Sequence, residues 1–192
     1  AVSFIESLRG STPRRICVAC TVEDADSLAK GMVDTLESKG FGELVRISCF
    51  WNGRVEVGGL SVAPILMEYK EPCDLGDSVL IVVKSIISSA CVVRTNLSNL
   101  IANTSPKRIF VVAPVMFKGA DKSLECEFEQ EISSRFEYLT LAVDDEKHDG
   151  KWVVQGVGGD IYTRLGYGGL ENKNNHVPLL VKARRQGPLL AA

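Results

Sequence analysis

Ser78-Val-Leu-Ile-Val-Val83 is the segment of this chain that decides its fold class. The five apolar residues from Val79 to Val83 have no polar residue among them, and they are too few for a helix of ordinary length. Such a short run is typical of a strand that is buried on both faces. Strands of this kind lie in parallel sheets whose two faces are covered by helices. We therefore expect Val79–Val83 at the centre of such a sheet.

The segments on either side alternate between strand and helix patterns. Beyond a short helical lead-in at Val2–Leu8, strands are predicted at Arg14–Cys20, Leu44–Trp51, Arg108–Ala113 and Phe136–Val143, and helices from Thr21 or Asp24 to Lys39, over about Ala90–Ala102 and over 122–134. This alternation predicts parallel crossover units, with ligands bound beyond the carboxyl ends of the strands. The expected fold is therefore a single α/β domain with a mainly parallel central sheet flanked by helices.

One part of this domain is expected to be antiparallel. Asn52-Gly53 is a tight-turn pair that would join the strand ending at Trp51 to Arg54–Val57, and Val62–Tyr69 is a further strand candidate. A β-hairpin is therefore predicted near residues 44–69. Pro114–Gly119 is expected to be a loop.

The C-terminal part has a different composition. Glu171–His176 is a polar run that is typical of a surface loop, and a basic tail follows it. We therefore divide the chain into a domain at residues 1–170 and a polar loop and tail at residues 171–192.

The length and net charge of the chain limit the classes of function that it could have. At 192 residues and 45% hydrophobic composition, the chain is long enough for one domain with its own core. A formal net charge of −2 gives no bulk attraction to nucleic acid or to an anionic membrane. The longest apolar runs are too short to cross a bilayer, and no signal segment opens the sequence. We expect a cytoplasmic location, or an organelle interior if a targeting segment has been removed.

The cysteines favour structural roles. Six are present, mostly inside apolar runs, where cysteine behaves as a small hydrophobic residue: Cys17, Cys20, Cys49, Cys73, Cys91 and Cys126. A zinc site at Cys17-Val-Ala-Cys20 would need a second ligand pair, which neither His148 nor His176 supplies. The odd spacing also directs the two thiols to opposite faces of a strand. Packing is therefore the favoured reading, with redox activity as the alternative.

Gln155-Gly-Val-Gly-Gly-Asp160 is a candidate binding loop. Its glycines permit positive φ or a close approach of the backbone to a ligand, and Asp160 adds an acceptor beside exposed amides. A glycine-rich connection without a ligand is the alternative. The acidic turn Val143-Asp-Asp-Glu-Lys147, just upstream, favours the ligand-binding reading.

Together, Ala142-Val-Asp-Asp-Glu-Lys147 and Gly150–Asp160 resemble the C-terminal signature of the uracil phosphoribosyltransferases. Gln155 stands where that family has a proline, and the loop is two residues shorter. The resemblance extends over about residues 27–168, with further matching segments at Leu28–Leu36, Arg46–Ser48, Val79–Cys91 and Val111–Pro114. It implies a phosphoribosyltransferase-like fold.

The resemblance also implies a set of site residues. The base would be held by Gly156, Val157, Gly158, Gly159 and Asp160, the 5-phosphate of phosphoribosyl pyrophosphate (PRPP) by Ser88, Ser89, Ala90 and Cys91, and the loop would be supported by Asp144 or Asp145. An active member would use Mg²⁺ with PRPP. Members of the family form dimers or larger assemblies, so a homo-oligomer or a protein partner is expected.

The sequence departs from the family at both PRPP contacts. Where the family ends its central strand with acidic residues that bind the ribose hydroxyls, this chain has Val83 and Lys84. The family's pyrophosphate loop carries an arginine, and its counterpart here is either Ser27–Ala29 or the acidic Thr21–Asp26. Neither contains an arginine. Lys84 could bind a phosphate as a point charge, but it cannot accept a hydrogen bond from a hydroxyl.

These departures leave three hypotheses and leave open whether the chain is an enzyme. The favoured one is a catalytically degenerate member with a nucleobase-binding, nucleotide-binding, regulatory or scaffold role. The second is an active phosphoribosyltransferase that makes a UMP-like nucleoside monophosphate from a base and PRPP. The third is an unrelated α/β domain, in which the charged turn Asp144–Asp149 could bind a metal, although a plain charged turn is favoured there.

Overall fold

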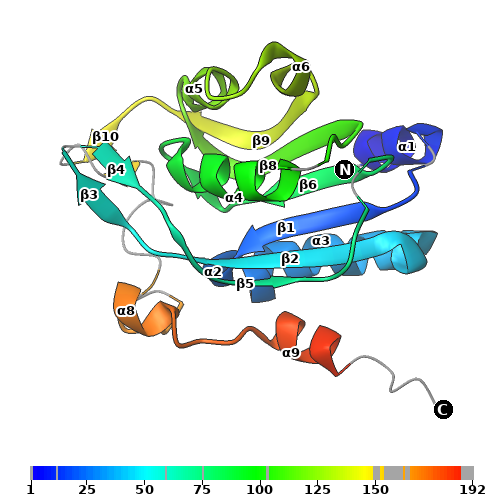
Figure 1. Ribbon diagram of the computed structural model, residues 1–192, viewed down its shortest axis with the longest axis horizontal. Helices are drawn as coiled ribbons and strands as arrows, with labels where there is room; N and C mark the ends of the chain where they lie inside the picture. The colour runs from blue at the N-terminus through cyan, green and yellow to red at the C-terminus, as the bar shows by residue number, and fades with distance from the viewer. Residues whose placement is uncertain are drawn as a thin grey trace.

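The central sheet of the computed structural model has the strand order β5-β2-β1-β6-β8, and β9 pairs with the free side of β8 (Figure 1). The structure describes residues 2–11, 13–58, 60–74, 76–102, 104–148, 152–153, 162 and 165–186. The strands are β1 (Ile16–Thr21), β2 (Val45–Asn52), β5 (Ile65–Lys70), β6 (Val79–Val83), β8 (Arg108–Phe117) and β9 (Phe136–Asp144). Neighbouring strands run parallel, except that β5 is antiparallel to β2. The expected α/β class with a mainly parallel sheet is confirmed.

A short seventh strand, β7 (Ile86–Ile87), continues the line of β6. Val83 at the end of β6 lies opposite Val112 of β8, and Ile86 of β7 lies opposite Val115 of the same strand. The sheet is therefore interrupted at Lys84-Ser85, and this interruption shapes the site described below.

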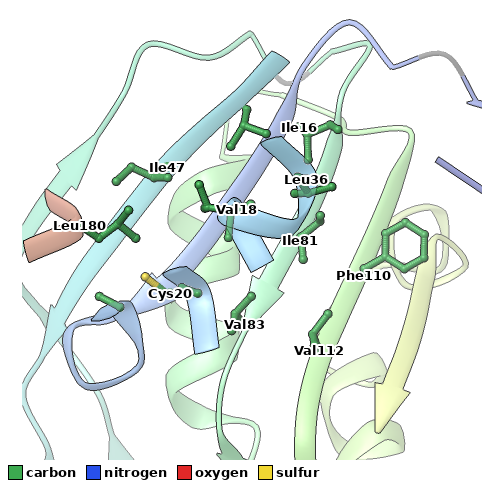
Figure 2. Close-up of a cluster of buried hydrophobic side chains, with 14 of the residues drawn as sticks. Ile16, Val18, Cys20, Leu36, Ile47, Ile81, Val83, Phe110, Val112 and Leu180 are labelled. Carbon is green, nitrogen blue, oxygen red and sulfur yellow. The ribbon is translucent and has the colours of Figure 1, made fainter. Parts of the chain in front are cut away.

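Helices cover both faces of the sheet. One face carries α1 (Val2–Ser11) and a helical segment from Val22 to Phe41 that combines α2 (Val22–Asp24), α3 (Lys30–Leu36) and two π-helical turns at Ala25–Ala29 and Glu37–Phe41. A single 3₁₀ turn at Gly42–Leu44 leads from this segment into β2. The other face carries α4 (Cys91–Ile101), α5 (Ala120–Glu125) and α6 (Gln130–Ser133). Figure 2 shows the first core, in which Leu36 lies close to side chains of β1 and β6, and Leu180 lies beside Ile47 of β2.

The packing of β6 explains why its unbroken apolar sequence predicted a strand at the centre of the sheet. Val79, Ile81 and Val83 belong to the core on one face, whereas Leu80 and Val82 belong to the core on the other. Successive side chains of a strand point to opposite faces, so only a strand buried on both sides needs an unbroken apolar run.

The antiparallel part contains one correction. Asn52-Gly53 was predicted as a tight hairpin turn, but β2 continues through Asn52 and pairs with β5. Between them, β3 (Val55–Val57) and β4 (Leu60–Val62) form a separate two-stranded arm. The turn prediction was wrong because the Asn52 side chain is buried and hydrogen-bonded to Asn96 and Ala63. A hairpin within residues 44–69 is nevertheless confirmed.

Three further expectations were wrong. Pro114–Gly119 is not a loop throughout, because β8 runs on to Phe117, and Pro114 lies where its neighbour changes from β6 to β7. The helix expected over 122–134 is divided into α5 and α6. Glu171–His176 is not a surface loop, because α8 (Leu170–Lys173) carries a buried Lys173, and α9 (Leu179–Arg185) packs on the core through Leu180 and Val181.

Two minor strands, β10 (Lys147–His148) and β11 (Trp152–Val153), form an antiparallel pair after β9. The candidate loop Gly156–Asp160 lies outside the described residues. Within the residues that are described, no helix is both long and apolar enough to cross a membrane.

Candidate functional site

A group of charged side chains lies where β1 and β6 end. Cys20 and Val83 lie directly opposite each other on these two strands, so the residues that follow them meet at the same edge of the sheet. These residues are Glu23 and Asp24 after β1 and Lys84 after β6. They are only 5%, 2% and 8% exposed, respectively. This is the edge where parallel α/β sheets bind ligands.

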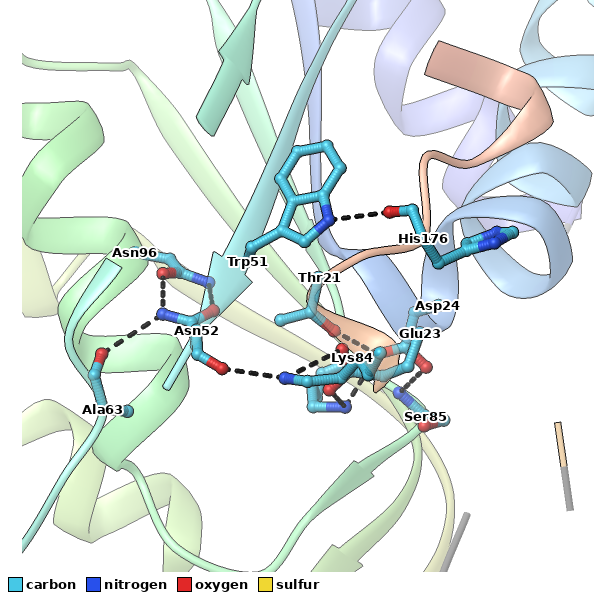
Figure 3. A network of polar contacts seen from close by, with 11 residues as sticks. Thr21, Glu23, Asp24, Trp51, Asn52, Ala63, Lys84, Ser85, Asn96 and His176 are labelled. Atoms are coloured by element: carbon cyan, nitrogen blue, oxygen red, sulfur yellow. Dashed lines mark hydrogen bonds and ion pairs between the residues drawn. The ribbon is translucent and has the colours of Figure 1, made fainter. Parts of the chain in front are cut away.

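Lys84 pairs with both carboxylates (Figure 3). Its Nζ lies 2.7 Å from Asp24 Oδ2 and 3.3 Å from Glu23 Oε1. Burial would lower the pKa of Lys84, but attraction to Asp24 and then to Glu23 outweighs burial and raises the pKa above the usual lysine value. Lys84 is therefore a charged, internally paired cation at neutral pH.

The Asp24 carboxylate collects several donors at once. It accepts hydrogen bonds from Thr21 Oγ1 at 2.9 Å, from Lys84 Nζ at 2.7 Å and from the backbone N–H of Ser85 at 3.2 Å. The break between β6 and β7 frees that backbone N–H, and Asp24 takes it. Asp24 thus occupies donors that would otherwise be available to an anionic ligand.

A second lysine reaches this group from the far end of the chain. Lys173 of α8 is 2% exposed, and its Nζ donates to the backbone carbonyl of Asn52 at 2.8 Å. The same nitrogen lies 3.8 Å from Glu23 Oε2 and 5.2 Å from the centre of the Tyr162 ring. Burial lowers the pKa of Lys173, and attraction to Glu23 only partly opposes this effect. Two acidic side chains and two lysine side chains therefore meet at this edge.

The C-terminal segment is fastened beside this group by specific hydrogen bonds. Trp51 Nε1 donates to the His176 carbonyl at 2.8 Å. The Asp26 carboxylate accepts from the N–H groups of Leu179 and Leu180, each at 2.8 Å, and so caps the first turn of α9. The C-terminal segment, whose residues 171–176 were expected to form a surface loop, is therefore held against β2 and the turn that follows β1.

The residues predicted to bind a phosphate lie at the start of α4. Ser88 and Cys91 are half-buried, Ser89 is exposed and Ala90 is buried, and no side chain caps this end of the helix. A cavity of about 10 Å³ lies between the ends of β1 and β6 and α4, with Thr21, Lys84 and Asn96 in its lining. That volume suits about one water molecule, and none of Ser88–Cys91 is among the residues that line it.

The other predicted residues are divided between two places. Asp144 is buried at the end of β9, and β8 separates β9 from β6 in the sheet, whereas Asp145 is exposed. The base-binding candidates Gly156, Val157, Gly158, Gly159 and Asp160 lie outside the described residues. Among those described, no group of three or more histidine, cysteine, aspartate or glutamate residues could hold a metal ion.

Part of this charged group was predictable from the sequence. The position of Lys84 and the acidic character of Thr21–Asp26 were both visible as residues that follow buried strands. The end of β1 at Thr21 now identifies Val22–Asp24 as the residues that directly follow this strand. Lys173 was missed, and a lysine in a polar run carries no signal of burial.

Comparison with known proteins supports the fold alone. No family model and no curated protein sequence matches this chain. The AQ2163 protein of Aquifex aeolicus superposes with a TM-score of 0.60 at 16% identity, covering 79% of this chain and 65% of that protein, so this chain spans just under two thirds of its length. TT1426 from Thermus thermophilus reaches a TM-score of 0.49 at 12% identity, with 76% and 82% covered. Adenine phosphoribosyltransferase from Thermoanaerobacter pseudethanolicus reaches 0.42 at 10% identity, with 74% and 79% covered.

Proposed function

We propose that this chain is a phosphoribosyltransferase-like domain that no longer turns over PRPP and serves as a nucleotide-sensing regulatory or scaffold subunit. The observation that carries the proposal is the buried ion pair of Lys84 with Asp24 at 2.7 Å. It lies at the edge of the sheet where the resembled family would bind PRPP.

The charges at the two PRPP contacts are exchanged relative to that family. The resemblance implies acidic residues after the central strand and an arginine after the first strand. Here Lys84 follows the central strand, and Glu23 and Asp24 follow the first. Among the residues that the structure describes, these exchanged charges pair with each other, so Lys84 offers the ribose hydroxyls no acceptor, and Glu23 and Asp24 offer the pyrophosphate no donor. Residues of this kind do not fit a Mg²⁺–PRPP complex, because a paired cation stands where acceptors are required.

The internal pair also opposes any rearrangement that would restore the site. Separating a buried ion pair and leaving one charge unpaired costs about 3–5 kcal/mol. That penalty corresponds to a loss of affinity of about a hundred- to several-thousand-fold. Phosphoribosyl transfer depends on positioning of the substrates and stabilisation of charge, so such a loss of affinity would lower the rate of turnover.

Binding of a nucleoside monophosphate is compatible with the same residues. The segment Ser88–Cys91 leads into the amino end of α4, where the helix dipole favours a phosphate. The loop Gly156–Asp160 is proposed to hold the base. An active enzyme that makes UMP from uracil and PRPP is the alternative, and a homo-oligomer or a protein partner is expected in either case.

Isothermal titration of the full chain tests the proposal. PRPP with Mg²⁺ should give no saturable heat and, with a panel of bases, no pyrophosphate, whereas UMP should bind. Ser88→Asp should abolish UMP binding by placing a carboxylate at the start of α4, and Ser98→Asp on the exposed side of the same helix should not. Saturable PRPP binding with pyrophosphate release would establish the active alternative. Failure of UMP and uracil to bind would refute the sensing role.

A further inference from the structure

Strand β9 forms one edge of the central sheet, and within the described part of the chain no strand pairs with its outer side (Figure 1). The consecutive residues Thr140–Val143 of this strand are all exposed. Leu141 is 90% exposed and Val143 is 60% exposed, although both are apolar. Successive side chains of a strand alternate between the two faces of a sheet, so Leu141 and Val143 share a face with the half-buried Leu139. A stripe of apolar side chains therefore extends from the core to solvent along this edge.

The opposite edge of the sheet carries charges that this stretch of β9 lacks. Strand β5 contains Glu68 and Lys70, which form an ion pair at 2.9 Å. Charged side chains on an edge strand discourage pairing with another chain. In β9, the run Tyr138–Val143 contains no charged residue and no proline, and most of its residues favour strands. An exposed edge with this composition is suited to pairing with a further strand.

The backbone of β9 presents hydrogen-bonding groups along the same side. The Ile109 N–H donates to the Arg135 carbonyl at 3.0 Å, and Ile109 lies opposite Phe136. In a parallel ladder, this pattern directs the backbone groups of odd-numbered β9 residues toward β8 and those of even-numbered residues outward. The Ala142 carbonyl accepts a hydrogen bond from Thr140 Oγ1 at 3.1 Å, as expected for a carbonyl that β8 does not take.

We propose that β9 pairs in antiparallel orientation with β9 of a second copy of this chain, around a two-fold axis at Thr140. The outward-facing residues then meet across the axis, because Thr140 lies opposite the partner's Thr140, and Tyr138 lies opposite the partner's Ala142. Leu139 of each copy comes beside the partner's Leu141, which joins the two apolar stripes into one surface. The two sheets become one continuous sheet with the same surface used on both copies.

Charge favours this position of the axis. Arg135, just before β9, comes opposite the partner's Asp145, which is exposed just after β9. Arg135 already pairs with the exposed Glu131 of its own copy, so this contact adds a second carboxylate to the same guanidinium. An axis at Leu141 would instead place Glu137 opposite the partner's Asp145, where like charges repel. The strand is therefore complementary to itself in the antiparallel orientation, which is what a two-fold dimer requires.

Sedimentation velocity of the full chain without nucleotide, over a series of protein concentrations, tests the dimer. Wild type should sediment as a dimer. Leu141→Lys should weaken dimerisation about a hundred-fold or more, because each dimer loses two leucines that pairing would bury. Met67→Lys is the matched control, because Met67 is 49% exposed on the opposite edge strand, and this variant should remain dimeric. A monomer at every concentration, or a dimer that Leu141→Lys leaves intact, would overturn the proposal.

Cysteine cross-linking tests the position of the axis. In a Cys126→Ser background, which removes an exposed native thiol, Thr140→Cys should form an intermolecular disulfide on mild oxidation. Residues that face each other at the axis have Cα atoms about 5.5 Å apart, within the range that a disulfide spans. Val143→Cys should not form this link, because the partner's Glu137 lies opposite it. Cross-linking through Val143→Cys and not through Thr140→Cys would overturn the proposed pairing.

The proposal identifies the surface of the homo-oligomer expected above and does not rest on nucleotide binding. The monomeric Leu141→Lys variant should therefore bind UMP as wild type does. A dimer that fails to bind UMP would refute the sensing role alone. A wild-type monomer that binds UMP would refute the β9 interface alone.

Discussion

Replacing Lys84 by methionine isolates the free-energy cost of leaving Asp24 and Glu23 buried without their cation. Methionine keeps most of the length and the apolar stem of lysine but removes the charge. Because Lys84 is 8% exposed and lies 2.7 Å from Asp24, the variant should lose about 3–5 kcal/mol of unfolding free energy. This loss is a large part of the stability of an ordinary domain.

Equilibrium unfolding in urea, followed by circular dichroism, measures the loss. Lys30→Met is the matched control, because Lys30 forms an even shorter ion pair, 2.6 Å from Asp34, in which both side chains are about half exposed. Solvent screening reduces the value of that pair to about 0.5 kcal/mol or less. The two variants differ in burial rather than in the length of the ion pair.

A double variant separates the unpaired charge from simple loss of packing. Adding Asp24→Asn to Lys84→Met removes one of the stranded carboxylates and should recover a substantial part of the lost stability. The reasoning is refuted if Lys84→Met and Lys30→Met lose the same free energy, or if the double variant is less stable than Lys84→Met alone.

The direction in which pH changes the stability difference between wild type and Lys84→Met follows from the pKa of Lys84. The pKa of Lys84 is raised in the folded protein, so its stabilising contribution is fully present below the ordinary lysine pKa of about 10.4. It is lost only as pH rises through the still higher pKa of the folded state. The difference in unfolding free energy between wild type and Lys84→Met should therefore stay constant around neutral pH and shrink only in strong alkali.

Other variants test the surrounding structure by the same unfolding measurement. Gly40 has φ of 90°, so Gly40→Ala should lower the free energy of unfolding by about 1 kcal/mol. Gly31 lies within α3 with open space around it, so Gly31→Ala should raise the free energy of unfolding by about 0.5–1 kcal/mol. Asp26→Ala removes the cap of α9 and should cost about 1 kcal/mol, with faster amide exchange confined to the C-terminal segment. Asn96→Ala removes both hydrogen bonds that Asn96 makes with the buried Asn52 side chain and leaves it only the bond to the Ala63 carbonyl, which should cost about 1–3 kcal/mol of unfolding free energy. No loss would mean that water replaces the pair.

Much of the fold was predictable because strand and helix patterns are local. Burial on both faces requires the unbroken run Val79–Val83, and the alternating patterns around it are enough to predict a mainly parallel sheet. The same period-two rule placed Cys17 and Cys20 on opposite faces, as the two cores confirm. Asn52-Gly53 misled the turn prediction because a buried partner on α4, which no local pattern reveals, takes the Asn52 side chain.

The sequence alone therefore determined where the main parallel strands lie and that Lys84 follows the central one. Only the tertiary structure decided what those residues contact. Asp24 and Lys84 are 60 positions apart, and they meet because β1 and β6 are adjacent and parallel. Lys173 is a lysine in a polar run, and only the return of the C-terminal segment to the sheet edge buries it beside Glu23. The order of the strands and the path of the C-terminal segment bring these distant charges together, and the local pattern of residues predicts neither.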